Sequence, residues 1–314
     1  MSATAESPVK MRERNAMLLG YLESDEVGLQ KRAVNAVNAF TRTTMREESF
    51  SRLILEPLPI TNDELDPQIY TDKPLKVIEK EPGQPPAISV PFANLPINFY
   101  IMSERYPVTF GRILSPRFTK DIAELRTYAM DIRKVLSDNA LKDMLAEEDG
   151  RFIQAVNAAV GTKDVVNPLV NTPLYQSIPG GITRETVVDA FKIMNLTRYR
   201  LEAHTCLCNF VTWKEFMKWG RDEVGGDLSQ DIVKNGMNLQ EFLGKRWIVT
   251  IKTDLVPVNE VYMFADPKFI GKSFILEDTT LYIKREHFML EMFFYETIGA
   301  TIGHVGGLAR ASFE

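Results

Sequence analysis

Ten prolines lie between Ile54 and Ser115, and this density constrains the fold of the chain more than any other feature of the sequence. Each proline lacks a backbone donor, and its ring disfavours the helical conformation in the residue before it. A long helix is therefore excluded from this segment. The ten are Pro57, Pro59, Pro67, Pro74, Pro82, Pro85, Pro86, Pro91, Pro96 and Pro107.

Short runs rich in β-branched and aromatic residues lie between these prolines, which is typical of strands. The runs are Leu75–Lys80, Ala87–Phe92, Ile97–Met102 and Tyr106–Ile113. Proline is confined largely to sheet edges and hairpin ends, so the segment is predicted to be a long hairpin with little core of its own. Such a hairpin should be stabilised by lying on something else.

A long helix is predicted after this segment. Ser115 and Pro116 resemble an N-cap followed by proline at the first helical position. An apolar stripe at spacings of three and four follows and continues to about Val160, with a possible bend at Ser137–Ala140. The stripe begins with Ile122, Leu125, Ala129, Ile132 and Leu136. A coiled coil is the alternative, but the stripe is too short for three or four heptads.

The remaining chain combines helices and strands. Residues 9–53 contain short amphipathic helices that indicate either an N-terminal subdomain or an arm that packs on a neighbouring subunit. A helix opened by Thr183 follows the long helix, and the last hundred residues alternate strands and turns. Helices in the middle of the chain with strands on both sides predict an α+β fold.

Four glycines near the C-terminus raise the question of a phosphate-binding loop: Gly299, Gly303, Gly306 and Gly307. Such a loop needs a following helix, and a Walker loop also needs Lys before Ser or Thr. Neither is present, and only 314 − 307 = 7 residues follow Gly307. The glycines are therefore predicted to let the last strands bend or approach other backbone closely.

A metal site is the other candidate chemistry. His204, Cys206 and Cys208 would lie on one face of a strand, but a spacing of one residue between cysteines suits zinc poorly. Small buried side chains are the favoured interpretation. Three consecutive acids, Glu147 to Asp149, are interpreted as a solvated run near a helix end. The aromatic residues Phe210, Trp213, Phe216 and Trp219 are predicted to lie in a core or an interface. No catalytic, cofactor or metal residues are assigned, and the chain is predicted not to be an enzyme.

Composition limits the class of protein. The length of 314 residues suits about two compact units. Two cysteines fit a reducing compartment, and a net charge of −5 gives no basic field for reading duplex DNA. No apolar run reaches the ~18 residues of a membrane span, and the N-terminus lacks the apolar core of a signal peptide. The chain is expected to stay in the cytoplasm.

The order of parts resembles the major capsid proteins of tailed bacteriophages, which have the Hong Kong 97 fold shared with encapsulin shells. The blocks that carry the resemblance are KPLKVIEKEPGQPPAISVPF (residues 73–92), the helical entry over residues 98–149, GKRWIVTIKTDLVPVNEVYMFADPKFIG (residues 244–271) and ETIGATIGHVGGLARASF (residues 296–313). Together with the connecting chain they span about residues 60–314.

The resemblance implies four parts. Residues 1–60 would be an N-terminal arm, and residues 61–114 an extended loop, a β-hairpin, that lies over an adjacent subunit. Residues 115–162 and 270–297 would form a peripheral domain with a long spine helix, and residues 163–269 and 298–314 a mixed α/β axial domain. Candidate interface residues are Lys73, Lys76, Glu79, Lys80, Glu81 and Phe92.

The resemblance also implies a function. The chain would self-assemble into pentamers and hexamers of an icosahedral phage head, in the cytoplasm of a host bacterium, and enclose double-stranded DNA without reading its sequence. A separate scaffolding protein is expected, and portal and decoration proteins are possible partners. No cofactor or membrane is expected. An encapsulin-like cargo shell and a soluble metal-dependent enzyme that uses His204, Cys206 and Cys208 are the alternatives.

Overall fold

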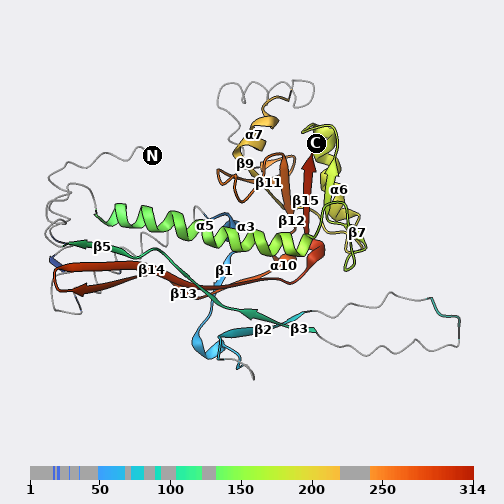
Figure 1. The fold of residues 1–314 in the computed structure, drawn as a ribbon. Coiled ribbons are helices and arrows are strands. Elements are labelled where there is room, and N and C mark those ends of the chain that lie inside the picture. The colour runs from blue at the N-terminus through green and yellow to red at the C-terminus, as the bar shows by residue number, and fades with distance from the viewer. Residues whose placement is uncertain are drawn as a thin grey trace.

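The computed structural model describes residues 49–67, 72–80, 89–92, 104–121, 132–219 and 241–314, with a few isolated positions before residue 49. Figure 1 shows a long helix, α5 (Ile132–Val160), running between two β-sheets, with a separate two-stranded ribbon on the far side of the lower sheet. Helices and strands are mixed without regular alternation, as expected for an α+β fold. Most of the predicted N-terminal helices lie outside the described residues.

The lower sheet has five strands and is built on one long hairpin. The hairpin strands β13 (Gly271–Glu286) and β14 (Met289–Ile302) are antiparallel and turn at His287, which has a left-handed φ of 56°. The other strands are β1 (Pro57–Pro59), β4 (Gly111–Leu114) and β5 (Phe118–Asp121). The first pairs with β13 in parallel, and β4 and β5 both pair with β14. The alternation of strands and turns expected for the last hundred residues is therefore interrupted here by one unusually long strand, β13.

Helix α5 covers one face of this sheet along its N-terminal half. Alternate residues of β14, Leu290, Met292 and Phe294, point into this contact, as the two-residue period of a strand requires. Met144 and Leu145 of α5 pack against them. The helix is not interrupted at Ser137–Ala140, where the sequence suggested a bend.

The predicted helix start at Ser115 and Pro116 is wrong. Ser115 lies between β4 and β5, and its hydroxyl accepts a hydrogen bond from the backbone N–H of Phe294 at 2.9 Å. Residues 118–121 form a strand because they add to the edge of β14, a tertiary pairing that overrides the helix-start signal of Ser115 and Pro116. The helix is described from Ile132 onward, and the first part of the predicted stripe, at residues 122–131, lies outside the described residues.

The upper sheet has six strands in the order β10-β11-β9-β12-β15-β8. Their bounds are Glu241–Phe242 (β10), Lys245–Thr250 (β11), Thr205–Asn209 (β9), Glu260–Phe264 (β12), Leu308–Phe313 (β15) and Tyr175–Ile178 (β8). Every residue of β9 and β12 is buried, which fits central strands covered on both faces. The main core of the protein lies around this sheet. The helices α6 (Arg184–Asn195) and α7 (Phe210–Phe216) and the C-terminal half of α5 contribute buried side chains to it.

The aromatic prediction for α7 is confirmed in large part. Trp213, Phe216 and Trp219 are buried in the main core and lie against Trp247 of β11 or against one another, with ring centroids 5.1–5.5 Å apart. Phe210 is not buried in this core, since 44% of its surface is exposed. Thr183 caps α6 as predicted, because its hydroxyl accepts from the backbone N–H of Thr186.

The remaining elements are short. They are α3 (Phe50–Ile54), η1 (Asn62–Glu64), β6 (Val166–Asn167), β7 (Thr172–Pro173), α10 (Pro267–Ile270) and η2 (Val305–Gly307). One of them, α3, lies with β1 of the lower sheet in the segment expected to be an N-terminal arm. Residues Phe50 and Ile54 of α3 belong to the main core, so the described end of this segment is part of the folded body.

The C-terminal glycines serve close backbone approaches. A Cβ atom at Gly299 would lie 3.0 Å from the carbonyl oxygen of Thr109, where the chain from the ribbon crosses β14. Gly306 and Gly307 belong to a single 3-10 turn that leads into β15, so no helix follows them. The prediction that these glycines shape the last strands is confirmed at Gly299.

Candidate assembly surfaces and the buried junction

The two-stranded ribbon of β2 (Leu75–Lys80) and β3 (Glu104–Thr109) is the predicted assembly element. Its strands pair antiparallel over six residues, from Leu75 opposite Thr109 to Lys80 opposite Glu104. The described strands contact the body through a small core in which Ile78 and Val108 pack with Phe274 of β13. Figure 1 shows the ribbon leaving the body beneath the five-stranded sheet. The expected hairpin strands at Leu75–Lys80 and near Tyr106–Ile113 are therefore present, the second divided into β3 and β4 at Phe110.

The described candidate interface residues differ in their surroundings. Lys73 is exposed. Lys76 is half-buried and donates from Nζ to the Glu64 carbonyl oxygen at 2.6 Å. Glu79 is exposed and pairs with Arg105 across the ribbon at 2.7 Å. These last two charges already have partners in their own chain.

Phe92 is the candidate with no covering residues, since its relative exposure is 106%. Ser89 to Phe92 lie outside any regular strand, and each of the four is exposed. The strand expected at Ala87–Phe92 is therefore not formed over its described part. The side chain of Lys80, the whole of Glu81 and the run Ile97–Met102 lie outside the described residues.

The structure also contains a buried ionic junction that the sequence analysis missed. Arg52 of α3 donates from Nε to Glu148 of α5 at 3.0 Å and from Nη2 to Glu296 of β14 at 2.9 Å. The side chains of all three are at most 5% exposed. Thr279 of β13 donates its hydroxyl to the same oxygen of Glu296 at 3.0 Å, and Asp278 lies 4.0 Å from Arg52 Nη1.

A second set of contacts extends the junction toward the six-stranded sheet. Asp149, which has no exposed surface, accepts hydrogen bonds at 3.0 Å from the Ser49 hydroxyl and from the Ser51 backbone N–H. Lys252, between β11 and β12, donates to its other oxygen at 2.6 Å. The junction therefore ties α3, α5, the lower sheet and the upper sheet together.

The interpretation of Glu147 to Asp149 as a solvated run is wrong for two of the three residues. Glu147 is exposed, but Glu148 and Asp149 are buried. The sequence does hold a signal, because 148 lies four residues after Met144 and 149 four residues after Leu145. Both acids therefore continue the apolar stripe of α5. A pair of acids on a buried stripe predicts buried cations, and the structure supplies Arg52 and Lys252.

Burial sets the protonation of this junction. Desolvation raises the pKa of Glu296 to about 7, and the neighbouring Glu148 adds to the shift while Arg52 opposes it. Burial also raises the pKa of Glu148, against the effect of Arg52. The pKa of Arg52 is raised in turn, because the pull of Glu148 and Glu296 exceeds its own desolvation.

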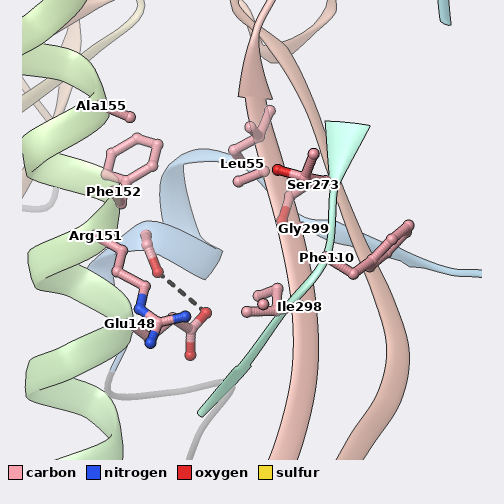
Figure 2. Close-up of a pocket in the computed structure, with 13 residues that line it drawn as sticks. Leu55, Phe110, Glu148, Arg151, Phe152, Ala155, Ser273, Ile298 and Gly299 are labelled. Atoms are coloured by element: carbon pink, nitrogen blue, oxygen red, sulfur yellow. Dashed lines mark hydrogen bonds between the residues drawn. The ribbon is translucent and has the colours of Figure 1, made fainter. Parts of the chain in front are cut away.

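Two pockets are lined in part by residues of the junction. One, of about 260 Å³, is lined by Ser51 and Glu148 together with apolar side chains of α5 and β14. Figure 2 shows Glu148, Arg151 and Phe152 of α5 on one side of it and Ile298 and Gly299 on the other. The second pocket, of about 310 Å³, is lined by Arg52, Asp278, Glu56 and Arg246 among others.

The candidate metal ligands are not brought together. Cys206 and Cys208 are completely buried in β9, and burial raises the pKa of both thiols, which keeps them protonated. His204, just before the strand, is exposed. Among the described residues, no three His, Cys, Asp or Glu side chains are arranged to hold a metal ion. The interpretation of the two cysteines as small buried core residues is confirmed.

Taken over the described residues, no helix has the length and apolar character needed to cross a membrane.

The fold is that of proteins that build viral and virus-like shells. No family model matches the chain, and no curated protein matches it. Solved structures do match. The capsid of an empty GTA particle matches at a TM-score of 0.60 with 10% identity, covering 84% of this chain and 90% of that one. The mature capsid of bacteriophage PhiM1 matches at 0.53 with 8% identity, covering 82% and 85%.

A virus-like particle from Pyrococcus furiosus is also similar, at a TM-score of 0.53 with 14% identity, covering 89% of this chain and 98% of that one. These matches extend over most of each chain, so the likeness concerns the whole architecture and not one domain. The Hong Kong 97-type capsid fold predicted from the order of parts is therefore confirmed.

Proposed function

We propose that this protein is a structural subunit, the major capsid protein of a tailed bacteriophage, that assembles into pentamers and hexamers of an icosahedral head. The observation that carries the proposal is a shell-protein fold over more than four-fifths of the chain, combined with a two-stranded ribbon and the fully exposed Phe92 in the segment that joins its strands. Such a segment gains burial against another molecule, and head-to-tail contacts between identical subunits close into rings and shells.

The division into parts belongs to the proposal. Residues 1–60 would be the arm, 61–114 the extended loop, 115–162 with 270–297 the peripheral domain, and 163–269 with 298–314 the axial domain. The separate cores of the two sheets support the last two. The end of the arm is folded against α5, so the part of it that reaches other subunits would precede Ser49.

The interface assignment is proposed for the same six residues of the extended loop: Lys73, Lys76, Glu79, Lys80, Glu81 and Phe92. Phe92 has the strongest support, since a fully exposed phenylalanine gains burial when a second subunit covers it. Lys76 and Glu79 have weaker support, because each already has a partner within the chain.

The proposed location is the virion, with assembly in the host cytoplasm. The head would enclose double-stranded DNA without reading its sequence, which fits a net charge of −5 and the absence of a basic field. A scaffolding protein would direct assembly, and portal and decoration proteins are the further partners expected of such a head.

Electron microscopy tests the proposal. The purified protein is examined by negative stain after size-exclusion chromatography, with and without co-expressed phage proteins. Five- or six-membered rings, tubes or icosahedral shells are expected. A homogeneous monomer under every condition would overturn the proposal.

An encapsulin-like cargo shell is the second candidate. The likeness to the virus-like particle from Pyrococcus furiosus, which covers 98% of that chain, favours it. The two candidates differ in what the shell holds. Shells of the protein expressed alone that retain a co-purifying host protein, bound through one short peptide, would favour the cargo shell. Shells that fill with DNA when phage proteins are present would favour the head.

A further inference from the structure

We propose that the junction of Arg52, Glu148 and Glu296 is a proton-operated latch on α3, which holds this segment against α5 and β14 while one proton is shared among its carboxyl groups and loosens when that proton leaves. The latch is a property of the folded subunit, so it stands apart from the proposed function.

Arg52 is the ionic attachment of α3, beside the apolar packing of Phe50 and Ile54 in the main core. This helix is five residues long, too short to be stable on its own, and Arg52 is the residue through which it contacts both α5 and β14 by charge. Its backbone is held by the same acids, because the Ser51 N–H donates to Asp149 and the Ser51 hydroxyl to Glu148. A change in the charge of the acids therefore acts directly on α3.

The charges of the junction do not balance when every group is ionised. Four carboxyl groups face it, namely Glu148 and Asp149 from α5, Asp278 from β13 and Glu296 from β14. The cations that face it are Arg52 from α3 and Lys252 from the loop after β11. Strand β4 contributes the uncharged Ile113 opposite Glu296. The side chain of Asp278 is 35% exposed, so the three buried carboxyl groups exceed the two cations by one negative charge. A buried excess charge is costly, and one proton removes it.

The position of that proton follows from the hydrogen bonds. Glu296 Oε2 accepts from Arg52 and Thr279, whereas Glu296 Oε1 is buried and has no partner among the described residues. An ionised oxygen without a donor is unfavourable in such a place, but a protonated one is tolerated. The pocket at Arg52 and Asp278 gives solvent a route to the junction.

The direction in which folding shifts the pKa of Glu296 determines whether the stability of the protein rises or falls with pH. The folded-state pKa of Glu296 is about 7, above its usual value of 4.5. The folded protein therefore holds a proton that the unfolded chain releases earlier, so the contribution to stability is present below about pH 4.5. It is lost as the pH rises from 4.5 to about 7, and the latch is loosest above that.

Hydrogen exchange on the full-length protein tests the latch. The reporters are the backbone amides of Ser51, Leu53 and Leu55, which donate to Asp149, Ser49 and Ser51. After correction for intrinsic exchange rates, their protection is expected to fall about tenfold or more between pH ~5.5 and pH ~8. The buried strand β12 serves as an internal reference that should change much less.

Two glutamine variants separate the latch from a general effect of pH. Glu296→Gln keeps the shape and removes the titration, so α3 should stay protected at both pH values. Glu147→Gln removes an exposed carboxylate one position from Glu148, and its pH dependence should match that of the unchanged protein.

Should Glu296→Gln fail to fold, infrared spectroscopy of the unchanged protein is the second measurement. A protonated carboxyl band that disappears near neutral pH is then expected. The proposal is overturned if α3 protection is equal at both pH values, if Glu296→Gln keeps the full pH dependence, or if no such band is present.

Discussion

The hydroxyl oxygen of Tyr106 in the ribbon lies 2.6 Å from the point that a Cβ atom would occupy at Gly303. Tyr106 is in β3 and Gly303 directly follows β14, so the glycine lets the base of the ribbon pack against the end of the long hairpin. The nearest atom is the end of a side chain. At Gly271, by contrast, the nearest atom to a Cβ would be the backbone oxygen of Thr301 at 2.1 Å.

Replacing Gly303 with alanine is expected to destabilise the protein by about 1–3 kcal/mol, because the new methyl group overlaps the Tyr106 hydroxyl. Tyr106→Phe removes that oxygen, so the double variant should recover most of the loss. Denaturant unfolding of the single and double variants measures the coupling free energy between positions 303 and 106. Gly271→Ala is the matched control, since Tyr106→Phe does not relieve a clash with backbone. Equal costs of Gly303→Ala with and without the hydroxyl would contradict this account.

Replacing Arg52 with alanine should be among the more damaging single changes in the described chain. It leaves Glu148 and Glu296 buried without their cation, which typically costs about 3–5 kcal/mol. The expected result is a large fall in the denaturant midpoint of unfolding.

Arg112→Ala is the control for this prediction, because the Arg112–Glu277 ion pair is solvent-exposed and should contribute about 1 kcal/mol or less. If the two variants unfold at similar denaturant concentrations, the junction does not contribute more to the free energy of unfolding than an exposed ion pair does.

The two cysteines are expected to be inert in the folded protein. Both thiols are buried and their pKa values are raised by burial, so neither solvent access nor the reactive thiolate is available. A thiol-specific reagent should modify neither in native buffer and both after unfolding. Prolonged chelation should leave the thermal unfolding midpoint unchanged. Rapid native labelling, or a fall of the midpoint on chelation, would instead favour a metal site at His204, Cys206 and Cys208.

Shortening the ribbon should abolish assembly but leave the subunit folded. Lys80 and Glu104 are opposite one another, so residues 81–103 can be replaced by the two-residue turn Asn-Gly without changing the register. The base of the ribbon keeps Ile78 and Val108 in place, and the main core is untouched. Circular dichroism and native thiol burial should therefore match the full chain, while microscopy should show no shells.

Normal shells from the shortened protein would remove the ribbon from the proposed interface. A variant that does not fold would contradict the expectation from the sequence that this hairpin has little core of its own.

Local pattern predicted the elements whose conformation depends mainly on neighbouring residues. The strand at Leu75–Lys80 has the predicted bounds, and Thr183 caps α6 as its position before an apolar periodic run indicates. The long helix was predicted correctly, but its predicted start at Ser115 and Pro116 was wrong. Residues 118–121 follow the cap-like Ser115 and Pro116, but pairing with Met289–Met292, about 170 positions away in sequence, makes them a strand.

By itself, the sequence determined that the chain has a proline-rich ribbon, a long central helix and two β-rich regions, because proline geometry and apolar periodicity act over a few residues. Their order was enough to indicate the capsid fold. Only the tertiary structure decided that Glu148 and Asp149 are buried and that Arg52 reaches Glu296 across 244 positions. The reason is physical: a charged residue tolerates burial only beside its partners, and the fold alone brings those partners together.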